Sequence, residues 1–398
     1  MFGDMTDFDF ERAIERRGTG CAKWDDAPRL YGSPDVLPLW VADMDFAAPP
    51  PVLDALRAQL EHGVYGYPAS RHDDVVAALA GWLERRHGWK VPHEWIVFAP
   101  GVVPALKNAL DAFTDEGDEI LIQPPVYHPF FDLGRSEGRI LSECPLVERG
   151  GRWEIDFDAF EAKAQTAEAF VLCNPHNPVG RAWTRQELIT LAEICAGTGT
   201  CVLSDEIHAD LVYAPAVHTP LAALEVLDPD RIATFVAPSK TFNLAGLNIS
   251  AAIIPDEAMR RKFTGLFRTR GIPCHNAPGL AAMEAAYARG DAWLDALLVH
   301  LRDNSRRLVD FARERWPGVV PNLPEATYLS WLDCRALGRT EAELVKLFTG
   351  KGLVGLNRGG MFGEAGRGWM RLNFGTTRAI LDEALERVAR ALESERKV

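Results

Sequence analysis

The part of the chain between residues 95 and 254 alternates apolar, β-branched runs with helical patterns, and this alternation restricts the possible folds more than any other feature. Short apolar runs bounded by turn residues are typical of buried strands. The expected strands are 95–99, 119–123, 140–146, 169–173, 200–204, 232–236 and 249–254, and helices are expected at 103–113, 157–164 and 185–196. This order predicts an α/β fold with a mostly parallel sheet that helices cover on both faces.

At 398 residues the chain is too long for one compact core, so two domains are expected. After Pro255 the pattern is mainly helical, and a second, smaller α/β pattern begins near residue 327. We predict a large domain at 46–290, a small C-terminal domain at 291–398, and an N-terminal arm at 1–45 that joins the small domain. A short helix is expected in the arm at 10–17.

Composition excludes several classes of protein. The chain has 43 Lys and Arg against 56 Asp and Glu, a net charge of −13, which argues against binding to nucleic acid or to anionic membranes. Seven scattered cysteines without a CxxC pair predict neither a disulfide framework nor a zinc site, and suit a reducing compartment. With no signal-peptide pattern at the N-terminus and no long apolar run, we expect a cytoplasmic protein.

One lysine, Lys240, lies between two of the expected buried strands, in the segment SKTFNLAG (239–246). Because its neighbours are small or apolar, its ammonium group should be poorly solvated and its pKa should fall. An amine with a lowered pKa is what Schiff-base chemistry requires. A loop lysine that points into solvent is the alternative, and this segment alone does not separate the two.

Other polar groups also follow the carboxyl ends of expected strands, where ligands bind in an open parallel sheet. The turn 100–104 leads into a helix and offers free backbone N–H groups to an anion. Tyr127, in a proline-rich turn, could stack on a flat ring or belong to the core. Asn177 stands in NPHNPVG (174–180) as a neutral hydrogen-bond donor.

Asp205 directly follows a strand in apolar surroundings, where a carboxylate needs a cationic partner. A metal bound by Asp205, Glu206, His208 and His176 is one possibility, but their spacing matches no familiar set of ligands. We therefore expect no metal. The partner could instead be the protonated pyridine nitrogen of a cofactor.

Taken in order, Asn177, Asp205, Ser239-Lys240 and Arg371 resemble the fold-type I pyridoxal-phosphate (PLP) enzymes of the aminotransferase class I/II superfamily. The resemblance covers nearly the whole chain. Further motifs are similar to the MalY/PatB branch, the cystathionine β-lyases or C–S β-lyases: PLWVADMDF (38–46), HGVYGYP (62–68), PPVYHPF (124–130), DEIHADL (205–211), SKTFNLAG (239–246) and MRLNFG (370–375).

The resemblance implies a role for each matching residue around the cofactor. Lys240 would form the Schiff base, Asp205 would bind the pyridinium N–H, Asn177 would bind the ring hydroxyl oxygen, and Tyr127 would stack on the ring. The backbone N–H groups of Val102 and Val103, with Ser239, would hold the phosphate. In a homodimer, Tyr67 would reach the phosphate bound by the neighbouring subunit; ordinary turn packing is the alternative for Tyr67, and Tyr65 is a nearby competitor.

The resemblance also implies a substrate pocket. Arg371 would bind the α-carboxylate with both arms of its guanidinium, although a structural ion pair in the strand is the alternative. Trp40 and Ala42 would line the pocket, and the glycine-rich segment 357–363 is expected to form a mobile loop at its mouth.

Two positions depart from the wider superfamily. His208 stands where typical aminotransferases have a tyrosine, and it could contact the cofactor or be a satisfied core histidine. Asn248 stands where they have a phosphate-binding arginine. Both departures favour the lyase branch over an ordinary transaminase.

The implied activity is an α,β-elimination that cleaves the Cβ–S bond of L-cystathionine or a related cysteine S-conjugate, giving a thiol, pyruvate and ammonia. An aminotransferase acting on an amino acid is the alternative, because it shares the early steps. A catalytically idle protein of the same fold that only binds a partner is disfavoured by the presence of Lys240, Asp205, Asn177 and Arg371 together.

Overall fold

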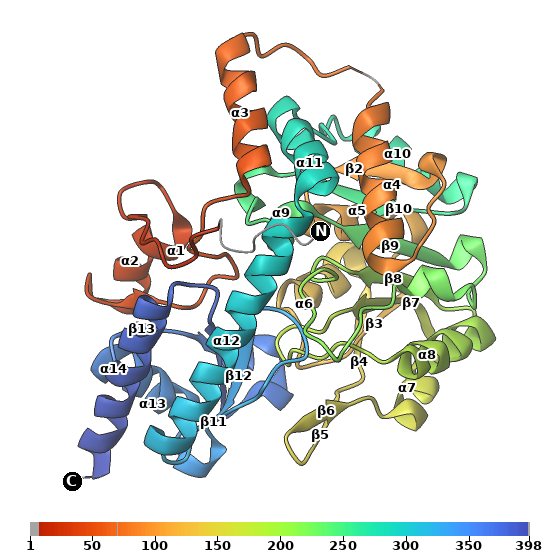
Figure 1. Ribbon diagram of the computed structural model, residues 1–398. Helices are drawn as coiled ribbons and strands as arrows, with labels where there is room; N and C mark the ends of the chain where they lie inside the picture. The colour runs from red at the N-terminus through yellow and green to blue at the C-terminus, as the bar shows by residue number, and fades with distance from the viewer. Residues whose placement is uncertain (1–7, 70, 397–398) are drawn as a thin grey trace.

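The computed structural model describes residues 8–69 and 71–396, and its centre is a seven-stranded sheet (Figure 1). The sheet has the order β2 (Ile96–Ala99), β10 (Ser250–Ile253), β9 (Ile232–Val236), β8 (Cys201–Asp205), β7 (Ala167–Cys173), β3 (Glu119–Ile122) and β4 (Ile140–Glu143). Only β10 runs antiparallel to its neighbours, β2 and β9. The predicted α/β fold with a mostly parallel sheet is confirmed.

Helices cover both faces of this sheet because alternate residues of each buried strand point to opposite sides. In β7, Val171 packs in the core beneath α5 (Val102–Phe113), α6 (Pro129–Gly134) and α10 (Glu257–Thr269). The next residue, Leu172, packs in the core beneath α7 (Phe157–Ala164) and α8 (Arg185–Thr198). A hairpin, β5 (Val147–Arg149) and β6 (Arg152–Glu154), precedes α7.

Three further helices form a layer of their own beside β2 and β10. They are α3 (Pro50–His62), α4 (Asp73–His87) and α11 (Ala277–Arg289), and α11 packs against both of the others. One turn of helix, α9 (Pro238–Thr241), follows β9 and contacts α11 of this layer.

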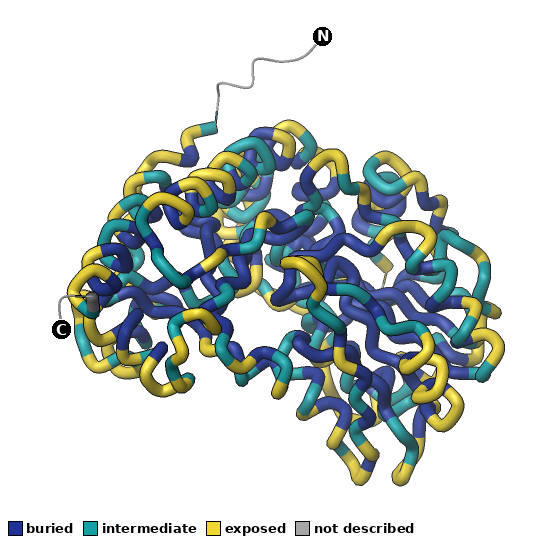
Figure 2. The backbone as a smooth tube through the Cα atoms, turned by 90° about the horizontal axis from the view of Figure 1, so that it is seen from below, coloured by how far each residue is buried: buried dark blue, intermediate teal, exposed yellow. Residues whose placement is uncertain are grey.

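The C-terminal part contains a second, antiparallel sheet with the order β11 (Val320–Pro321), β12 (Leu329–Asp333), β15 (Trp369–Asn373) and β14 (Asn357–Arg358). The long helix α12 (Asp291–Arg315) packs along α14 (Arg378–Arg396) beside it. α13 (Glu341–Val345) continues into a π-helical turn, η7 (Lys346–Lys351). Buried residues concentrate in the sheets and exposed residues on the outer turns (Figure 2).

The segment before residue 46 lies against the C-terminal part. β1 (Leu37–Pro38) pairs in parallel with β13 (Val354–Gly355), and the Asn373 backbone N–H donates to the Leu39 carbonyl at 2.9 Å. Residues 1–7 of the arm lie outside the described residues. The boundaries drawn at 45 and 290 stay a prediction.

The helix expected at 10–17 is wrong: the arm instead forms α1 (Ala22–Asp25) and α2 (Ala27–Tyr31). Tertiary contacts explain the difference, since Arg16 pairs with Asp43 and Asp45, each at 2.7 Å. In the described part of the chain, no helix combines the length and the apolar character that crossing a membrane demands.

Candidate active site

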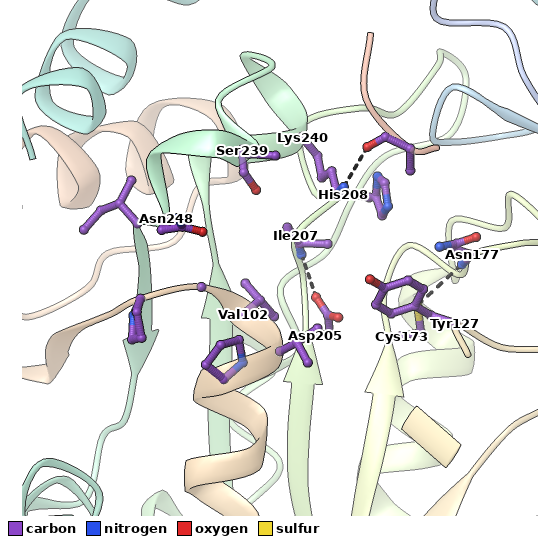
Figure 3. A pocket seen from close by; sticks show the side chains of 17 residues that line it. Val102, Tyr127, Cys173, Asn177, Asp205, Ile207, His208, Ser239, Lys240 and Asn248 are labelled. Atoms are coloured by element: carbon purple, nitrogen blue, oxygen red, sulfur yellow. Dashed lines mark hydrogen bonds between the residues drawn. The ribbon is translucent and has the colours of Figure 1, made fainter. Parts of the chain in front are cut away.

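A cavity of about 310 Å³ opens at the carboxyl ends of β7, β8 and β9 (Figure 3). Its walls come from the start of α5, from the loops after β3, β7 and β8, from α9 and from the N-terminal arm. Of the site residues expected from the sequence, it brings together Ala42, Val102, Val103, Tyr127, Asn177, Asp205, His208, Ser239 and Lys240, with Asn248 beside them.

Lys240 enters the cavity from α9, where its Nζ donates a hydrogen bond to the carbonyl oxygen of Ala42 at 2.7 Å. Burial of the ammonium group lowers the pKa of Lys240 from 10.5 to about 8, although the carboxylates of Asp43 and Asp205 oppose this change. Near neutral pH a larger share of Lys240 is therefore neutral, and hence nucleophilic and basic, than of an ordinary lysine. The residue does not point into bulk solvent as an ordinary loop lysine would.

Asp205 ends β8 with its side chain buried at the floor of the cavity. Its Oδ1 accepts a hydrogen bond from the Ile207 backbone N–H at 3.1 Å, and no cationic side chain lies within ion-pair distance of it among the described residues. Burial raises the pKa of Asp205 to about 7. Asp205 can therefore accept a hydrogen bond from a protonated ring nitrogen, which would supply the cationic partner that it lacks.

The first turn of α5 forms one end of the cavity. Gly101, with φ +147°, precedes the helix, and no side chain caps the helix there. The backbone N–H groups of Val102 and Val103 have no carbonyl partner within the helix, and Pro104 has no N–H. Together with the nearby Ser239, this turn can receive a phosphate group.

Arg371 reaches the region from β15 in the small C-terminal sheet and is almost fully buried. Its Nη1 donates to Asn177 Oδ1 at 3.0 Å, and its Nη2 donates to the Trp40 carbonyl at 3.0 Å and to Asn357 Oδ1 at 2.7 Å. Burial lowers the pKa of Arg371 to about 10. None of the described carboxylates pairs with it, so the structural ion pair considered above is absent and the charge remains available to a ligand.

Arg371 and Trp40 do not form part of the cavity wall itself but lie behind it. Asn177 connects the two regions, because it lines the cavity and accepts the hydrogen bond from Arg371. The guanidinium of Arg371 also lies over the ring of Phe362, 4.8 Å from its centre.

Comparison with known proteins agrees with this geometry. The model of the family described as aminotransferase class I and II matches residues 34–388. The chain belongs to the aminotransferase class I and II family.

Two curated proteins are similar to this chain over almost their whole length. Cystathionine beta-lyase PatB of Bacillus subtilis (strain 168) is 44% identical over 96% of this chain and 99% of its own. Protein MalY of Escherichia coli (strain K12) is 32% identical over 98% of this chain and 100% of its own. The resemblance to the MalY/PatB branch is confirmed.

Among solved structures, cystalysin from Treponema denticola, which contains pyridoxal 5′-phosphate, is 35% identical with a TM-score of 0.94 over 98% of this chain and 99% of its own. The PLP-bound C–S lyase from Staphylococcus hominis is 30% identical with a TM-score of 0.89 over 97% of this chain and 98% of its own.

The two positions that depart from typical aminotransferases both line the cavity. His208 is buried, its Nδ1 has no hydrogen-bond partner, and burial lowers the pKa of its ring to about 3, so it is neutral. The Asn248 side chain makes no hydrogen bond, and no arginine lines the described cavity wall. A phosphate here would depend on Lys240 and on backbone dipoles for its positive surroundings within this chain.

Tyr67 does not reach the cavity of its own chain. Its side chain is fully exposed, and Leu60, Val64 and Tyr65 beside it are also largely exposed. These four residues, which we call the 60–67 apolar patch, occupy the end of α3 and the loop that follows it.

Three residues near the site were missed by sequence reasoning. The Tyr328 hydroxyl donates to the Ala42 carbonyl at 2.9 Å, and Asn357 and Phe362 surround Arg371. The segment 357–363, expected to be a mobile loop, instead begins as strand β14 and buries Phe362. Only the glycines of this segment could have indicated that it is closely packed. At Gly359 a Cβ would meet the Gly366 and Trp369 carbonyl oxygens, so close packing requires glycine there.

Proposed function

We propose that this chain is a PLP-dependent C–S β-lyase that cleaves L-cystathionine or a related cysteine S-conjugate to a thiol, pyruvate and ammonia. The observation that carries the proposal is the pairing, in one cavity, of a lysine whose pKa is lowered to about 8 with a buried carboxylate that lacks a cation. The similarity to a cystathionine beta-lyase at 44% identity supports the choice of reaction.

The residues of the cavity fit PLP at each of its polar groups. Lys240 would attach it covalently, Asp205 would bind its ring nitrogen, and the Val102 and Val103 N–H groups with Ser239 would hold its phosphate. Tyr127 would stack on the ring, and Asn177 would bind the ring oxygen. The neutral His208 can also contact the ring region, in place of the tyrosine of typical aminotransferases.

When bound, PLP supplies an acceptor for the electrons released at Cα of the amino acid. Asp205 would hold a proton on the ring nitrogen and so maintain that acceptor. Lys240, once freed from the cofactor, would remove the Cα proton as a general base, which its lowered pKa permits. Loss of this proton would allow the thiolate to leave from Cβ.

Substrate binding would depend on Arg371. Its unpaired guanidinium, held by Asn177, Asn357 and the Trp40 carbonyl, can bind the α-carboxylate and orient Cα toward Lys240. Trp40 and Ala42 would form the adjacent wall.

We further propose that the active unit is a cytoplasmic homodimer in which Tyr67 reaches the partner's cofactor phosphate. The exposed 60–67 apolar patch supports an interface at this surface, since large apolar side chains gather there without cover. All seven cysteines are free, which suits a reducing compartment.

The test is to supply L-cystathionine and PLP to the purified protein without any keto acid. Pyruvate and homocysteine should form in equal amounts. An aminotransferase, the alternative that the family name favours, would release no pyruvate from cystathionine and would turn over only when a keto acid is added to accept the amino group. Transamination without elimination would overturn the proposal.

A further inference from the structure

Asp210 lies five positions after Asp205, outside the cavity, and joins three segments of the fold. Its Oδ1 accepts hydrogen bonds from Trp82 Nε1 at 2.9 Å and from His87 Nε2 at 2.8 Å, both on α4. Its Oδ2 accepts a hydrogen bond from the Thr241 hydroxyl, on α9, at 2.7 Å. Only 8% of the Asp210 side chain is exposed.

The charge on Asp210 is maintained in spite of this position. Burial by itself would raise the pKa of Asp210, but the hydrogen bonds from His87, Thr241 and Trp82 outweigh burial and hold the pKa below its ordinary value. A buried carboxylate with three donors is a firm anchor, because each donor would lose a charge-assisted hydrogen bond if it moved.

The Thr241 contact matters because Thr241 directly follows Lys240. α9 has only four residues, and no side chain caps its N-terminus, so the turn cannot maintain its orientation by helical hydrogen bonds alone. Thr241 is fully buried, and its hydroxyl bond to Asp210 fixes the end of the turn. Lys240 itself has only one hydrogen bond, to Ala42.

A second buried carboxylate anchors the segment of Asp205 in the same way. Glu206 accepts hydrogen bonds from the Ser204 hydroxyl at 2.8 Å, from the Leu221 N–H at 3.0 Å and from His218 Nε2 at 2.9 Å. The His218 ring lies edge-on to that of His87, with centres 5.1 Å apart, and His87 leads to Asp210. The two residues that we assign to chemistry, Asp205 and Lys240, are thus each followed directly by a residue of a buried hydrogen-bond cluster, and the two clusters meet at the contact between the His87 and His218 rings.

We propose that Asp210 is a positioning residue for Lys240, acting through the hydroxyl of Thr241 to fix the turn that carries the lysine. This inference rests on the proposed function of Lys240. Asp210 does not line the cavity and touches no reacting group, so its effect is on the place of the Lys240 amine and not on any step directly.

The experiment compares Thr241→Val, which removes the hydroxyl at nearly constant volume, with Thr241→Ser, which restores it. Thr234→Val is the matched control, because Thr234 is also fully buried, lies on β9 before α9, and has a hydroxyl without a partner. Circular dichroism and thermal unfolding check that each variant is folded.

Two readouts are taken on apoenzyme, without a thioether substrate. The first is the pKa of Lys240, from the pH dependence of its labelling by acetic anhydride, with peptide mass spectrometry and the exposed Lys90 as internal reference. The second is the rate at which added PLP is captured, followed by absorbance. If the protein did not cleave cystathionine, the proposed reaction would be wrong, but the labelling and PLP-capture measurements would still test the role of Asp210.

In Thr241→Val we expect the midpoint of Lys240 labelling to rise by about one pH unit toward that of an ordinary lysine, because a loosened turn lets the ammonium reach water. PLP capture should slow about tenfold at pH 7.5, in proportion to the neutral amine. Thr241→Ser and Thr234→Val should match the wild type. Asp210→Asn should move both readouts in the same direction as Thr241→Val.

The inference is overturned if Thr241→Val keeps both the wild-type midpoint and the wild-type capture rate. It is also overturned if Thr241→Ser fails to restore them, since packing and not the hydroxyl would then hold the turn. If Asp210→Asn does not fold, the comparison of Thr241→Val with Thr241→Ser is sufficient to test the inference.

Discussion

Lys240 and Tyr328 donate hydrogen bonds to the same acceptor, the carbonyl oxygen of Ala42, at 2.7 and 2.9 Å. The three residues come from α9, from the segment before β12 and from the N-terminal arm. The position of the lysine amine is therefore set jointly by parts of the chain that are far apart in sequence. The Ala42 carbonyl oxygen therefore shares its hydrogen-bonding capacity between the Lys240 amine and the Tyr328 hydroxyl.

Tyr328→Phe tests this sharing. Without the hydroxyl, the Ala42 oxygen interacts more strongly with a protonated Lys240, so the pKa of the lysine should rise and less of the amine should be neutral at pH 7. We expect kcat/KM for cystathionine to fall several-fold at pH 7 and to recover toward the wild-type value near pH 9. A loss that is equal at all pH values would show that the hydroxyl acts in some other way.

Lys240→Ala should abolish pyruvate formation while the fold is retained, because no other amine lines the described cavity wall. Pyruvate is assayed with lactate dehydrogenase, and the fold is checked by thermal unfolding. Borohydride treatment of the wild type should add the mass of reduced PLP to the peptide that contains Lys240. More than a trace of turnover in the variant would contradict the assignment of Lys240.

The sheet could be predicted because its strands carry their signal locally: 232–236, for example, is apolar or β-branched at every position and is observed as β9 over the same residues. The residues at strand ends were predictable for the same reason, since chain order alone brings Asn177, Asp205 and Lys240 to one edge of a parallel sheet.

Contacts between distant segments could not be predicted in this way. Nothing local to Tyr328 indicates that its hydroxyl would reach Ala42, and nothing local to Asn357 indicates that it would hold Arg371. The helix wrongly expected in the arm has the same cause. Arg16 is not helical and forms ion pairs with Asp43 and Asp45, which a short-range sequence pattern does not predict. The absence of an arginine at Asn248 is likewise not compensated nearby, since no arginine lines the described cavity wall.

Asp205→Asn should make the apoenzyme more stable while it destroys the activity. Burial raises the pKa of Asp205 from 3.8 to about 7, above its value in the unfolded chain. The contribution of protonated Asp205 to the free energy of unfolding of the wild type is therefore fully present below pH 4. It is lost as the pH rises to about 7, at about 1.4 kcal/mol per pH unit.

The uncharged amide has no such loss, so the stability of the Asn variant relative to wild type should increase from pH 4 to 7 and stay constant above pH 7. Denaturant unfolding of both apoproteins across this range measures the difference. A difference that does not change with pH would mean that Asp205 ionises normally in the folded chain. With PLP, the variant should exchange the Cα proton of a slow substrate far more slowly than the wild type, because the ring nitrogen is no longer kept protonated.

Mixing two inactive variants tests whether Tyr67 serves the partner's site. Tyr67→Ala and Lys240→Ala homodimers should both be nearly inactive. When they are unfolded together and refolded, half of the dimers are mixed and carry one intact site in two, so about a quarter of wild-type activity should return. If Tyr67 served its own subunit, every site in the mixture would be defective and no activity would return. Each variant refolded alone is the control.

Arg371 supplies the sharpest test of substrate orientation. Since no described carboxylate pairs with it, its removal leaves no buried counter-charge behind, and the fold should tolerate Arg371→Ala. A buried, charge-assisted contact to the α-carboxylate predicts a loss of about a hundredfold or more in kcat/KM. Arg371→Lys keeps the charge but loses the two-armed geometry, so it should recover little of that loss.

Two further measurements separate a substrate-binding role from a structural one. PLP binding, read from its absorbance, should hardly change in Arg371→Ala, because Arg371 does not line the cavity that would receive PLP. Cysteamine thioethers, which lack the α-carboxylate, should be poor substrates for the wild type and no poorer for the variant. Loss of PLP or unfolding of Arg371→Ala would instead make the residue structural, and the small C-terminal sheet would then have no direct part in binding substrate.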